Sequence, residues 1–340
     1  MEALVLEAPN RFAYQQRPIP PCGSKQVRVR LEAVCICGSD AGAISGKNAL
    51  FTYPRVLGHE ACGIVEKVGD DVTGFKPGDR VCLMPCIPCK SCRACRRGKT
   101  NCCEKLRLFG VQEDGALQEF LTVPEENLLK IPFDASPEAV AAIEPLTIGA
   151  HAAARLRLEP EDRVLVIGAG PIGVSCALNA RTYGASVWLA DTSEVRRNFV
   201  NSRFSLEVLD AMAYDYPEKI ESITQGELFD AVIDTTAAKA SMDNAWRYIT
   251  HGGQVLYVGI CGSTIALDGV AFHLKEPILG TTRNSTPADY QRVLRFWQLG
   301  LLEPERLVTH SASFREAAQA IQQWTAPGSG VFKGVIRFPD

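Results

Sequence analysis

The stretch "DRVLVIGAGPIGVSCALNARTYGASVWLAD", residues 162–191, decides the fold of this chain. An apolar run at its start predicts a buried strand, the middle predicts a helix, and "ASVWLAD" (185–191) predicts a second strand. A glycine-rich turn with the spacing G-x-G-x-x-G joins the first strand to the helix. This order of strand, glycine-rich turn, helix and strand is typical of a dinucleotide-binding unit on a parallel sheet.

The glycine-rich turn predicts where a dinucleotide binds. Its glycines allow a tight turn and a close approach of the backbone to a pyrophosphate, and the following helix offers free N–H groups and the positive end of its dipole. Such a turn can also cap an ordinary helix, so the interpretation depends on the strands around it. The predicted contact residues of the turn are Gly168, Gly170, Pro171, Ile172 and Gly173.

Asp191, at the end of the second strand, indicates which dinucleotide is preferred. It lies about 20 residues after the glycines, where a carboxylate accepts hydrogen bonds from the adenosine ribose. Its charge also repels a 2′-phosphate, which favours NAD over NADP. Arg196 and Arg197 follow closely, and a nearby arginine can instead accommodate a 2′-phosphate, lie on a solvated helix face or stack on the adenine. We therefore predict NAD, with Arg196 as a further contact.

The pattern outside this stretch divides the chain. After residue 146, strands keep alternating with helices, which predicts a doubly wound parallel sheet. Before it, short β-rich runs are separated by Gly, Pro and Asp turns, and the last part of the chain holds a helix and a closing strand. The fold class is therefore α/β. The predicted divisions are a β-rich domain over 1–145, a dinucleotide-binding domain over 146–284 and a C-terminal return to the first domain over 285–340.

Composition and charge indicate which partners, which compartment and which cysteine chemistry to expect. Lys plus Arg is 36 against 39 Asp plus Glu, a net charge of −3, so we expect neither nucleic acid nor a membrane as a partner. The chain shows no signal peptide and no span of about 18 apolar residues, so we expect a cytoplasmic protein. Ten of its 13 cysteines lie between Cys35 and Cys103. In a reducing compartment, clustered thiols indicate metal binding or catalysis rather than disulfides.

The densest cysteine cluster is "CIPCKSCRACRRGKTNCC", residues 86–103. Three cysteines have C-x2-C-x2-C spacing, and a fourth follows after seven intervening residues. Four thiolates close a tetrahedral shell around zinc and make the site structural. An iron–sulfur cluster is the alternative. The lysines and arginines between the cysteines offset the negative charge of the site, while Cys86 and Cys102 have no predicted role. The predicted ligands are Cys89, Cys92, Cys95 and Cys103.

A second, sparser set comes from "VCICGSD" (34–40), "VLGHEACG" (56–63) and "AAIEPLTIGAHA" (141–152). Mixed sulfur, nitrogen and oxygen ligands are typical of a catalytic zinc with one open position. A thiolate, a neutral imidazole and one carboxylate balance the charge of Zn²⁺, and a second carboxylate makes the site negative. We therefore expect Glu144 either to exchange with Glu60 or to bind the zinc-bound water. The candidate residues are Cys37, His59, Glu60 and Glu144.

With these motifs in order, the whole chain resembles the zinc-containing medium-chain alcohol dehydrogenase family. The likeness rests on "CGSD", "GHE", "GDRV", the four-cysteine lobe, "IEP", "GAGPIG" and "HGGQVLYVG". It implies a GroES-like catalytic domain from both ends of the chain, an inserted Rossmann domain, and about two zinc ions per subunit, one catalytic and one structural. It also implies that Ser39 takes the alcohol proton. We further predict Val258 and Arg283 as cofactor contacts.

Within that family, the chain is similar to the polyol, threonine and sugar-acid branch, through "YPRVLGHE", "GKTNCCEK" and "TRNSTPADY". This implies oxidation of a secondary alcohol of a polyol or sugar acid, such as L-galactonate or L-gulonate at C5, by a homodimer or homotetramer. The alternatives are an L-threonine or sorbitol-type dehydrogenase, or a non-catalytic NAD-binding relative. Many relatives have a relay histidine where this chain has Gly42, and a glycine where it has Cys35. The positional candidates for substrate contacts are Gln112, Glu113, Arg283 and Asn284, and Arg283 is also a candidate for a cofactor contact instead.

Overall fold

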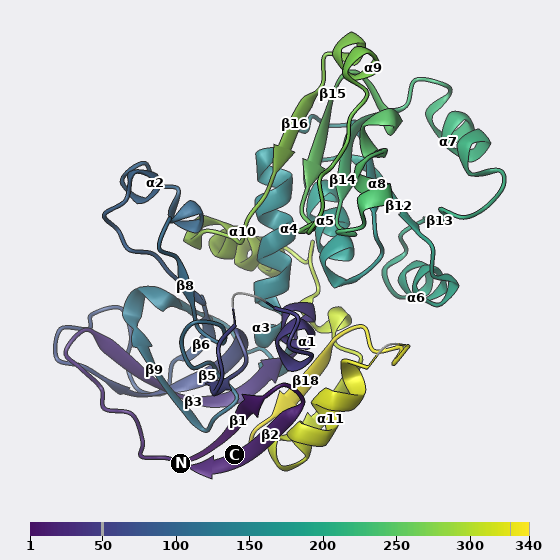
Figure 1. The fold of residues 1–340 in the computed structure, drawn as a ribbon. Coiled ribbons are helices and arrows are strands. Elements are labelled where there is room, and N and C mark those ends of the chain that lie inside the picture. The colour runs from purple at the N-terminus through teal and green to yellow at the C-terminus, as the bar shows by residue number, and fades with distance from the viewer. Residues whose placement is uncertain (49–50, 327, 340) are drawn as a thin grey trace. The chain divides into compact units, whose positions relative to one another are not determined.

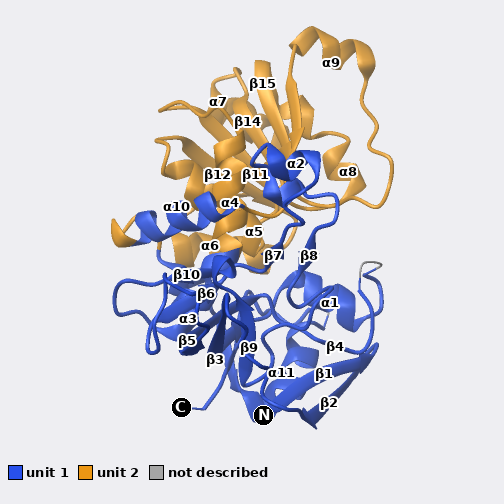
Figure 2. Cartoon of the chain, turned by 90° about the vertical axis from the view of Figure 1, so that its left-hand side faces the viewer, with its two compact units in different colours: residues 1–144, 286–297, 303–340 blue, residues 145–285, 298–302 orange. Residues whose placement is uncertain are grey.

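The computed structural model describes residues 1–48, 51–326 and 328–339 (Figure 1). The chain forms two compact units, which Figure 2 shows in blue and orange. Unit 1 comprises Met1–Glu144, Thr286–Trp297 and Glu303–Asp340, and unit 2 comprises Pro145–Ser285 and Gln298–Leu302. Both ends of the chain therefore contribute to unit 1.

Unit 2 contains a parallel sheet of six strands within its described residues, in the order β13-β12-β11-β14-β15-β16. Its central strand β11 is fully apolar and buried after its first residue, and this confirms the predicted doubly wound α/β architecture. The strands are β11 (Arg163–Ile167), β12 (Ser186–Asp191), β13 (Val208–Asp210), β14 (Phe229–Asp234), β15 (Ile249–Tyr257) and β16 (Ile278–Thr281). The helices are α4 (Ile143–Arg155), which begins in unit 1, α5 (Pro171–Arg181), α6 (Glu194–Phe204), α7 (Tyr216–Thr224), α8 (Lys239–Met242) and α9 (Gly269–Lys275).

The glycine-rich turn between β11 and α5 needs its glycines for steric reasons. Gly168 has φ +102°, a backbone conformation that residues with a Cβ rarely adopt. A Cβ on Gly173 would lie 1.8 Å from the Gly168 carbonyl oxygen, so the first turn of α5 packs directly on the turn. Pro171 occupies the first helical position, where its missing N–H costs nothing.

Unit 1 is built on a mixed sheet in the order β10-β6-β5-β3-β18-β17, with β9 also paired to β3, and on a smaller sheet β2-β1-β4. Strand β18, near the C-terminus, pairs antiparallel with β3, which follows from the two ends of the chain sharing one core (Figure 1). The described strands are β1 (Glu2–Ala8), β2 (Arg11–Gln16), β3 (Gln26–Cys35), β4 (Arg55–Val56), β5 (Glu60–Val68), β6 (Arg80–Leu83), β7 (Cys86–Ile87), β8 (Arg107–Leu108), β9 (Phe120–Pro124), β10 (Leu128–Lys130), β17 (His310–Ser313) and β18 (Gly334–Arg337). The helices are α1 (Gly38–Ile44), α2 (Arg93–Arg96), α3 (Pro137–Ala141), α10 (Pro287–Gln298) and α11 (Ala317–Trp324).

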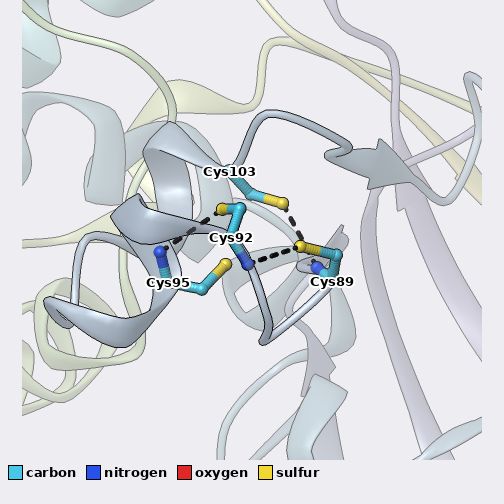
Figure 3. A group of neighbouring side chains, drawn as sticks. All are labelled: Cys89, Cys92, Cys95 and Cys103. Atoms are coloured by element: carbon cyan, nitrogen blue, oxygen red, sulfur yellow. Dashed lines mark hydrogen bonds between the residues drawn. The ribbon is translucent and has the colours of Figure 1, made fainter.

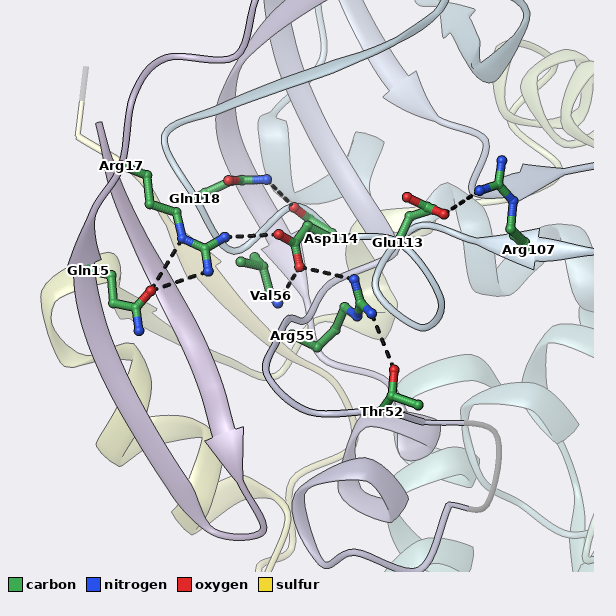
Figure 4. Close-up of polar contacts among 10 residues, drawn as sticks. Gln15, Arg17, Thr52, Arg55, Val56, Arg107, Glu113, Asp114 and Gln118 are labelled. Carbon is green, nitrogen blue, oxygen red and sulfur yellow. Dashed lines mark hydrogen bonds and ion pairs between the residues drawn. The ribbon is translucent and has the colours of Figure 1, made fainter.

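Asp114 fixes the loop between β8 and β9 to the strand that leads into the site. Its carboxylate accepts hydrogen bonds from the Val56 backbone N–H at 3.0 Å and from Arg17 at 2.9 Å, and it lies 3.4 Å from Arg55 (Figure 4). One carboxylate thus ties β4 and the end of β2 to this loop. Because β4 is only three residues before His59, this anchoring holds the start of β5 in place.

No helix in the described part of the chain is both long enough and apolar enough to span a membrane.

Candidate functional site

Among the described residues, two groups of thiol, imidazole and carboxylate side chains lie close enough together to hold a metal ion. One joins Cys37, His59 and Glu60, whose ligand atoms all lie within 4.8 Å of one another. Strand pairing explains this proximity, since Cys35 is the register partner of Glu60 and Cys37 lies two residues beyond the end of β3. The other group is the four-cysteine lobe.

His59 has one ring nitrogen facing the metal group and one facing a carboxylate. Its Nε2 lies 3.4 Å from Ser39 Oγ, and its Nδ1 lies 3.8 Å from Asp40 Oδ1. Nδ1 is buried and has no hydrogen-bond partner among the described residues. A histidine that ligates a metal commonly directs its other nitrogen at a carboxylate, so this arrangement fits metal binding through Nε2.

The pKa of His59 shows that the pocket is strongly anionic. Burial acts to lower this pKa, yet the charges of Asp40, Cys37 and Glu144 outweigh burial and raise it well above its usual value. The buried pocket therefore favours a positive charge at the imidazole. A divalent cation bound there would satisfy the same anions.

Glu144, from the first turn of α4, belongs to the same pocket. Burial, together with the nearby Glu60 carboxylate, raises the pKa of Glu144 to about 7. Two buried carboxylates at close range are costly unless a cation offsets them. The thiol, the imidazole and the carboxylates therefore match the donor set of a catalytic zinc site.

Lys333 is a buried neighbour of Glu60 that the sequence did not reveal. It lies immediately before β18, and its ammonium donates to both oxygens of Glu60 at 2.8 Å and to the Ile36 carbonyl at 3.3 Å. Lys333 is 3% exposed and Glu60 is 0% exposed. The charge balance drawn from the sequence was incomplete because it omitted this buried cation. The one available signal was a lysine between apolar residues in "GVFKGVIRF".

These pKa shifts predict how stabilisation by zinc depends on pH. Burial raises the pKa of Asp40 and of Glu144, and the pocket's anions raise that of His59, so the zinc-free folded state binds more protons than the unfolded state. Its free energy of unfolding therefore falls as pH rises from about 4.5 through 7, by about 1.4 kcal/mol per pH unit for each extra proton. Zinc replaces these protons. The difference in Tm between zinc-loaded and chelator-treated protein should widen between about pH 5 and 7, and a constant or shrinking difference would contradict the account.

The four-cysteine lobe forms the second metal group. Figure 3 shows the sulfurs of Cys89, Cys92, Cys95 and Cys103 converging, and all four lie within 4.8 Å of one another. Sulfurs at about 2.3 Å from one tetrahedral zinc ion are about 3.8 Å apart, so the group fits a single ion. Cys86, in β7, and the exposed Cys102 lie outside this group.

Backbone N–H groups in the lobe are directed at the sulfurs. Cys92 N–H donates to Cys89 Sγ at 3.3 Å, and Lys105 N–H donates to Cys103 Sγ at 3.3 Å. The Ser91 hydroxyl and neighbouring N–H groups lower the pKa of Cys89 to about 6. The lobe thus stabilises a thiolate at Cys89, which is the form that binds zinc. At Cys95, burial and the neighbouring cysteines instead raise the pKa to about 12. Of the basic residues, Lys90 forms an ion pair with Glu126 at 2.6 Å.

Asp191 has a structural task besides the predicted one. Its two carboxylate oxygens accept hydrogen bonds from the Ala169 N–H at 2.7 Å and the Ser193 N–H at 2.8 Å. It therefore ties the end of β12 to the glycine-rich turn. Arg197 donates to the Asp191 carbonyl and to Asp210, whereas Arg196 is largely exposed, with its guanidinium 3.9 Å from the Asp191 carboxylate.

The other residues predicted to contact the cofactor or the substrate are divided between the two units. Val258 follows β15 and donates its N–H to the Asp234 carbonyl at 2.9 Å, and Arg283 follows β16. Both are at the carboxyl edge of the parallel sheet, where dinucleotides bind in such folds. In unit 1, Glu113 forms an ion pair with Arg107 at 2.5 Å (Figure 4), and Gln112 accepts the Leu108 N–H at 3.0 Å. Asn284 has a left-handed backbone with φ +49°.

Comparisons with known proteins give the family. The model of the alcohol dehydrogenase GroES-like domain matches residues 23–133, and that of the zinc-binding dehydrogenase matches residues 171–298. L-galactonate-5-dehydrogenase of Escherichia coli (strain K12) is 38% identical over 339 residues, 99% of this chain and 99% of that protein.

Two solved structures share the fold over nearly the full length. The short chain alcohol dehydrogenase rspB of Escherichia coli CFT073, complexed with NADH, has a TM-score of 0.92 and 28% identity, covering 99% of each chain. A zinc-binding dehydrogenase of Sinorhizobium meliloti 1021, bound to NADP, has a TM-score of 0.90 and 26% identity, covering 99% of this chain and 98% of that one. The predicted family, fold class and enzyme class are thereby confirmed. The chain belongs to the zinc-containing medium-chain alcohol dehydrogenase family and is an oxidoreductase with a GroES-like and a Rossmann-type domain.

Proposed function

We propose that this protein oxidises a secondary alcohol of a polyol or sugar acid to a ketone with NAD, with substrates such as L-galactonate or L-gulonate at C5. The observation that carries the reaction type is the group of half-buried Cys37 with buried His59 and Glu60, beside the buried carboxylate of Glu144. The similarity to L-galactonate-5-dehydrogenase supports the substrate class. We further propose a cytoplasmic homodimer or homotetramer with a catalytic and a structural zinc.

The candidate residues of the two units divide the work of such a reaction. Cys37, His59 and a carboxylate from Glu60 or Glu144 would hold a zinc ion, which when bound supplies the Lewis acidity that lowers the pKa of an alcohol hydroxyl. The Gly168–Gly173 turn and Asp191 would hold the NAD pyrophosphate and ribose. Held by these residues, NAD would supply the acceptor for the hydride of the alcohol carbon.

Ser39 is the candidate for moving the alcohol proton. Its hydroxyl is 3.4 Å from His59 Nε2, so it lies at the side of the ring that faces the metal group. Ser39 is also exposed, which gives its hydroxyl access to water. Because Gly42 offers no imidazole, the proton would pass from Ser39 directly to water.

A panel of substrates tests this function. Zinc-loaded protein with NAD or NADP would be assayed against aldonates, polyols and L-threonine by the absorbance of the reduced nicotinamide. Aldonates or polyols with NAD should give the highest kcat/KM. A preference for L-threonine, or no turnover with any secondary alcohol, would contradict the proposal, and the latter would favour a non-catalytic relative.

Asp191→Asn tests the choice of NAD. The change removes the charge that repels a 2′-phosphate but keeps an oxygen that accepts a backbone N–H. We expect the ratio of kcat/KM for NADP to that for NAD to rise roughly tenfold or more. The matched control is Glu207→Gln. Glu207 immediately precedes β13, the strand next to β12, and it lies at the end of β13 that is away from Asp191. If wild type and Asp191→Asn gave the same ratio of kcat/KM for NADP to kcat/KM for NAD, Asp191 would not determine the choice of cofactor.

A further inference from the structure

Asp234 is a buried carboxylate that the proposed reaction leaves unexplained. It is the last residue of β14 and is 0% exposed. Strand β11 lies between β12 and β14, so Asp191 and Asp234 flank the glycine-rich turn from the carboxyl ends of its two neighbouring strands. Burying a carboxylate is unfavourable unless hydrogen bonds satisfy it. The bonds of Asp234 therefore indicate what this charge stabilises.

These bonds order the segment that follows β14. One Asp234 oxygen accepts the Thr236 N–H at 2.9 Å and the Thr236 hydroxyl at 2.7 Å, and the other accepts the Ser241 hydroxyl from α8. Between these two anchors, Ala237 has a left-handed backbone with φ +58°. A residue with a Cβ keeps such a conformation only where its surroundings fix it. Asp234 thus holds residues 235–241 in one arrangement.

Thr235, the first residue of this segment, contacts the glycine-rich turn. Its N–H and its hydroxyl each donate to the Ile167 carbonyl at 2.9 Å, immediately before the turn. A Cβ on Gly168 would lie 2.5 Å from the Thr235 hydroxyl oxygen, and a Cβ on Gly173 would lie 3.2 Å from it. The hydroxyl therefore occupies the space that both glycines leave open on the β14 side.

A turn held from both sides presents its backbone N–H groups in fixed directions. Asp191 accepts the Ala169 N–H from the β12 side, and Thr235 donates to the end of β11 from the β14 side. The free N–H groups at the start of α5 bind a pyrophosphate only if they point at it together, and a fixed turn avoids the entropic cost of aligning them. Resting on the proposed function, we propose that Thr235 is a positioning residue that sets the affinity of the turn for the pyrophosphate of NAD, without touching the cofactor.

Titration calorimetry with ADP-ribose tests this without turnover, since ADP-ribose carries the pyrophosphate but no nicotinamide. Thr235→Val keeps the shape of the side chain and removes the hydroxyl. The Kd of ADP-ribose should rise roughly 5- to 10-fold, as expected for one lost hydrogen bond, whereas the Kd of adenosine, measured by competition, should stay within about twofold. Thr235→Ser should keep the wild-type Kd, because it keeps the hydroxyl. In turnover by Thr235→Val, the KM for NAD should rise while kcat stays nearly unchanged.

Thr224→Val is the matched control for a merely structural effect. Thr224 is a buried threonine of unit 2, in α7, whose hydroxyl donates to the Ile220 carbonyl at 2.7 Å. The Arg163 guanidinium donates to the Thr224 carbonyl, which places this control at the amino end of β11, opposite the turn. Thr224→Val should lower the Tm as Thr235→Val does but leave the Kd of ADP-ribose unchanged.

Ser241→Ala decides the question if Thr235→Val does not fold. It removes one hydrogen bond that holds the segment to Asp234, and the Kd of ADP-ribose should rise about threefold. A wild-type Kd of ADP-ribose in folded Thr235→Val, or in Ser241→Ala where Thr235→Val does not fold, would overturn the inference, as would an equal rise for adenosine. If wild-type protein bound no ADP-ribose, the proposed NAD site itself would fail, and the inference with it.

Discussion

Replacing Cys37 by alanine is expected to lower turnover by at least about 1,000-fold, or about 4 kcal/mol of transition-state stabilisation, while the protein stays folded. Cys37 is the thiol in the group with His59 and Glu60, and its loss removes one of the anions that hold a cation in the pocket. Because Cys37 is only half-buried, its side chain contributes little to the core. Metal content should fall from about two zinc ions per subunit toward about one.

The matched control for this variant is Cys35→Ala. Cys35 is a buried thiol at the end of β3, two residues before Cys37, and burial raises its pKa well above the usual value, so it stays protonated and fills core space. Its replacement should leave both zinc ions in place. Equal turnover in Cys37→Ala and wild type at matched zinc content would show that Cys37 is no ligand of the reacting metal.

Replacing Cys92 by alanine is expected to affect stability rather than chemistry. Helix α2 of the lobe contains no buried residue, so little core packing holds this helix in place without a metal. Structural zinc contributes roughly 10 kcal/mol or more to the folding of small zinc-finger peptides. The variant should lose about one zinc ion per subunit, exchange the amides of residues 86–103 rapidly and unfold several degrees lower than wild type.

Cys102→Ala is the control in the same lobe, since this exposed cysteine lies outside the group of four. It should match wild type in zinc content, hydrogen exchange and Tm. If Cys92→Ala kept the stability and amide protection of wild type but lost turnover, the division into a structural and a catalytic site would be wrong.

The features that the sequence predicted are local in the chain. The glycine-rich turn lies within six residues, and its strict spacing reflects steric contacts such as that of Gly173 with the Gly168 carbonyl. The four cysteines of the lobe lie within 15 residues, Cys89 to Cys103, and their spacing alone predicted the group that the structure brings together. Short-range geometry of this kind can be read directly from residue order.

What could not be predicted depends on contacts between distant segments. Nothing in the pattern around Lys333 says that it meets Glu60, because that contact requires the antiparallel pairing of β18 with β3 and of β3 with β5. Asp40 was visible in "CGSD", yet its place beside His59 Nδ1 follows from the fold of α1 next to β5. The sequence likewise predicted a contact of Asp191 with the ribose but not its hydrogen bond to the backbone of the glycine-rich turn.

The measurement that tests the central claim most directly is zinc-dependent reduction of NAD by wild-type protein. The protein would be freed of metal by a chelator, checked by metal analysis, and assayed with an aldonate or polyol before and after zinc is returned. We expect no reduced nicotinamide from the metal-free protein and recovery of turnover in step with zinc bound in the Cys37 pocket. Equal rates with and without zinc, or no reduction of NAD by fully loaded protein with any aldonate or polyol, would contradict the account.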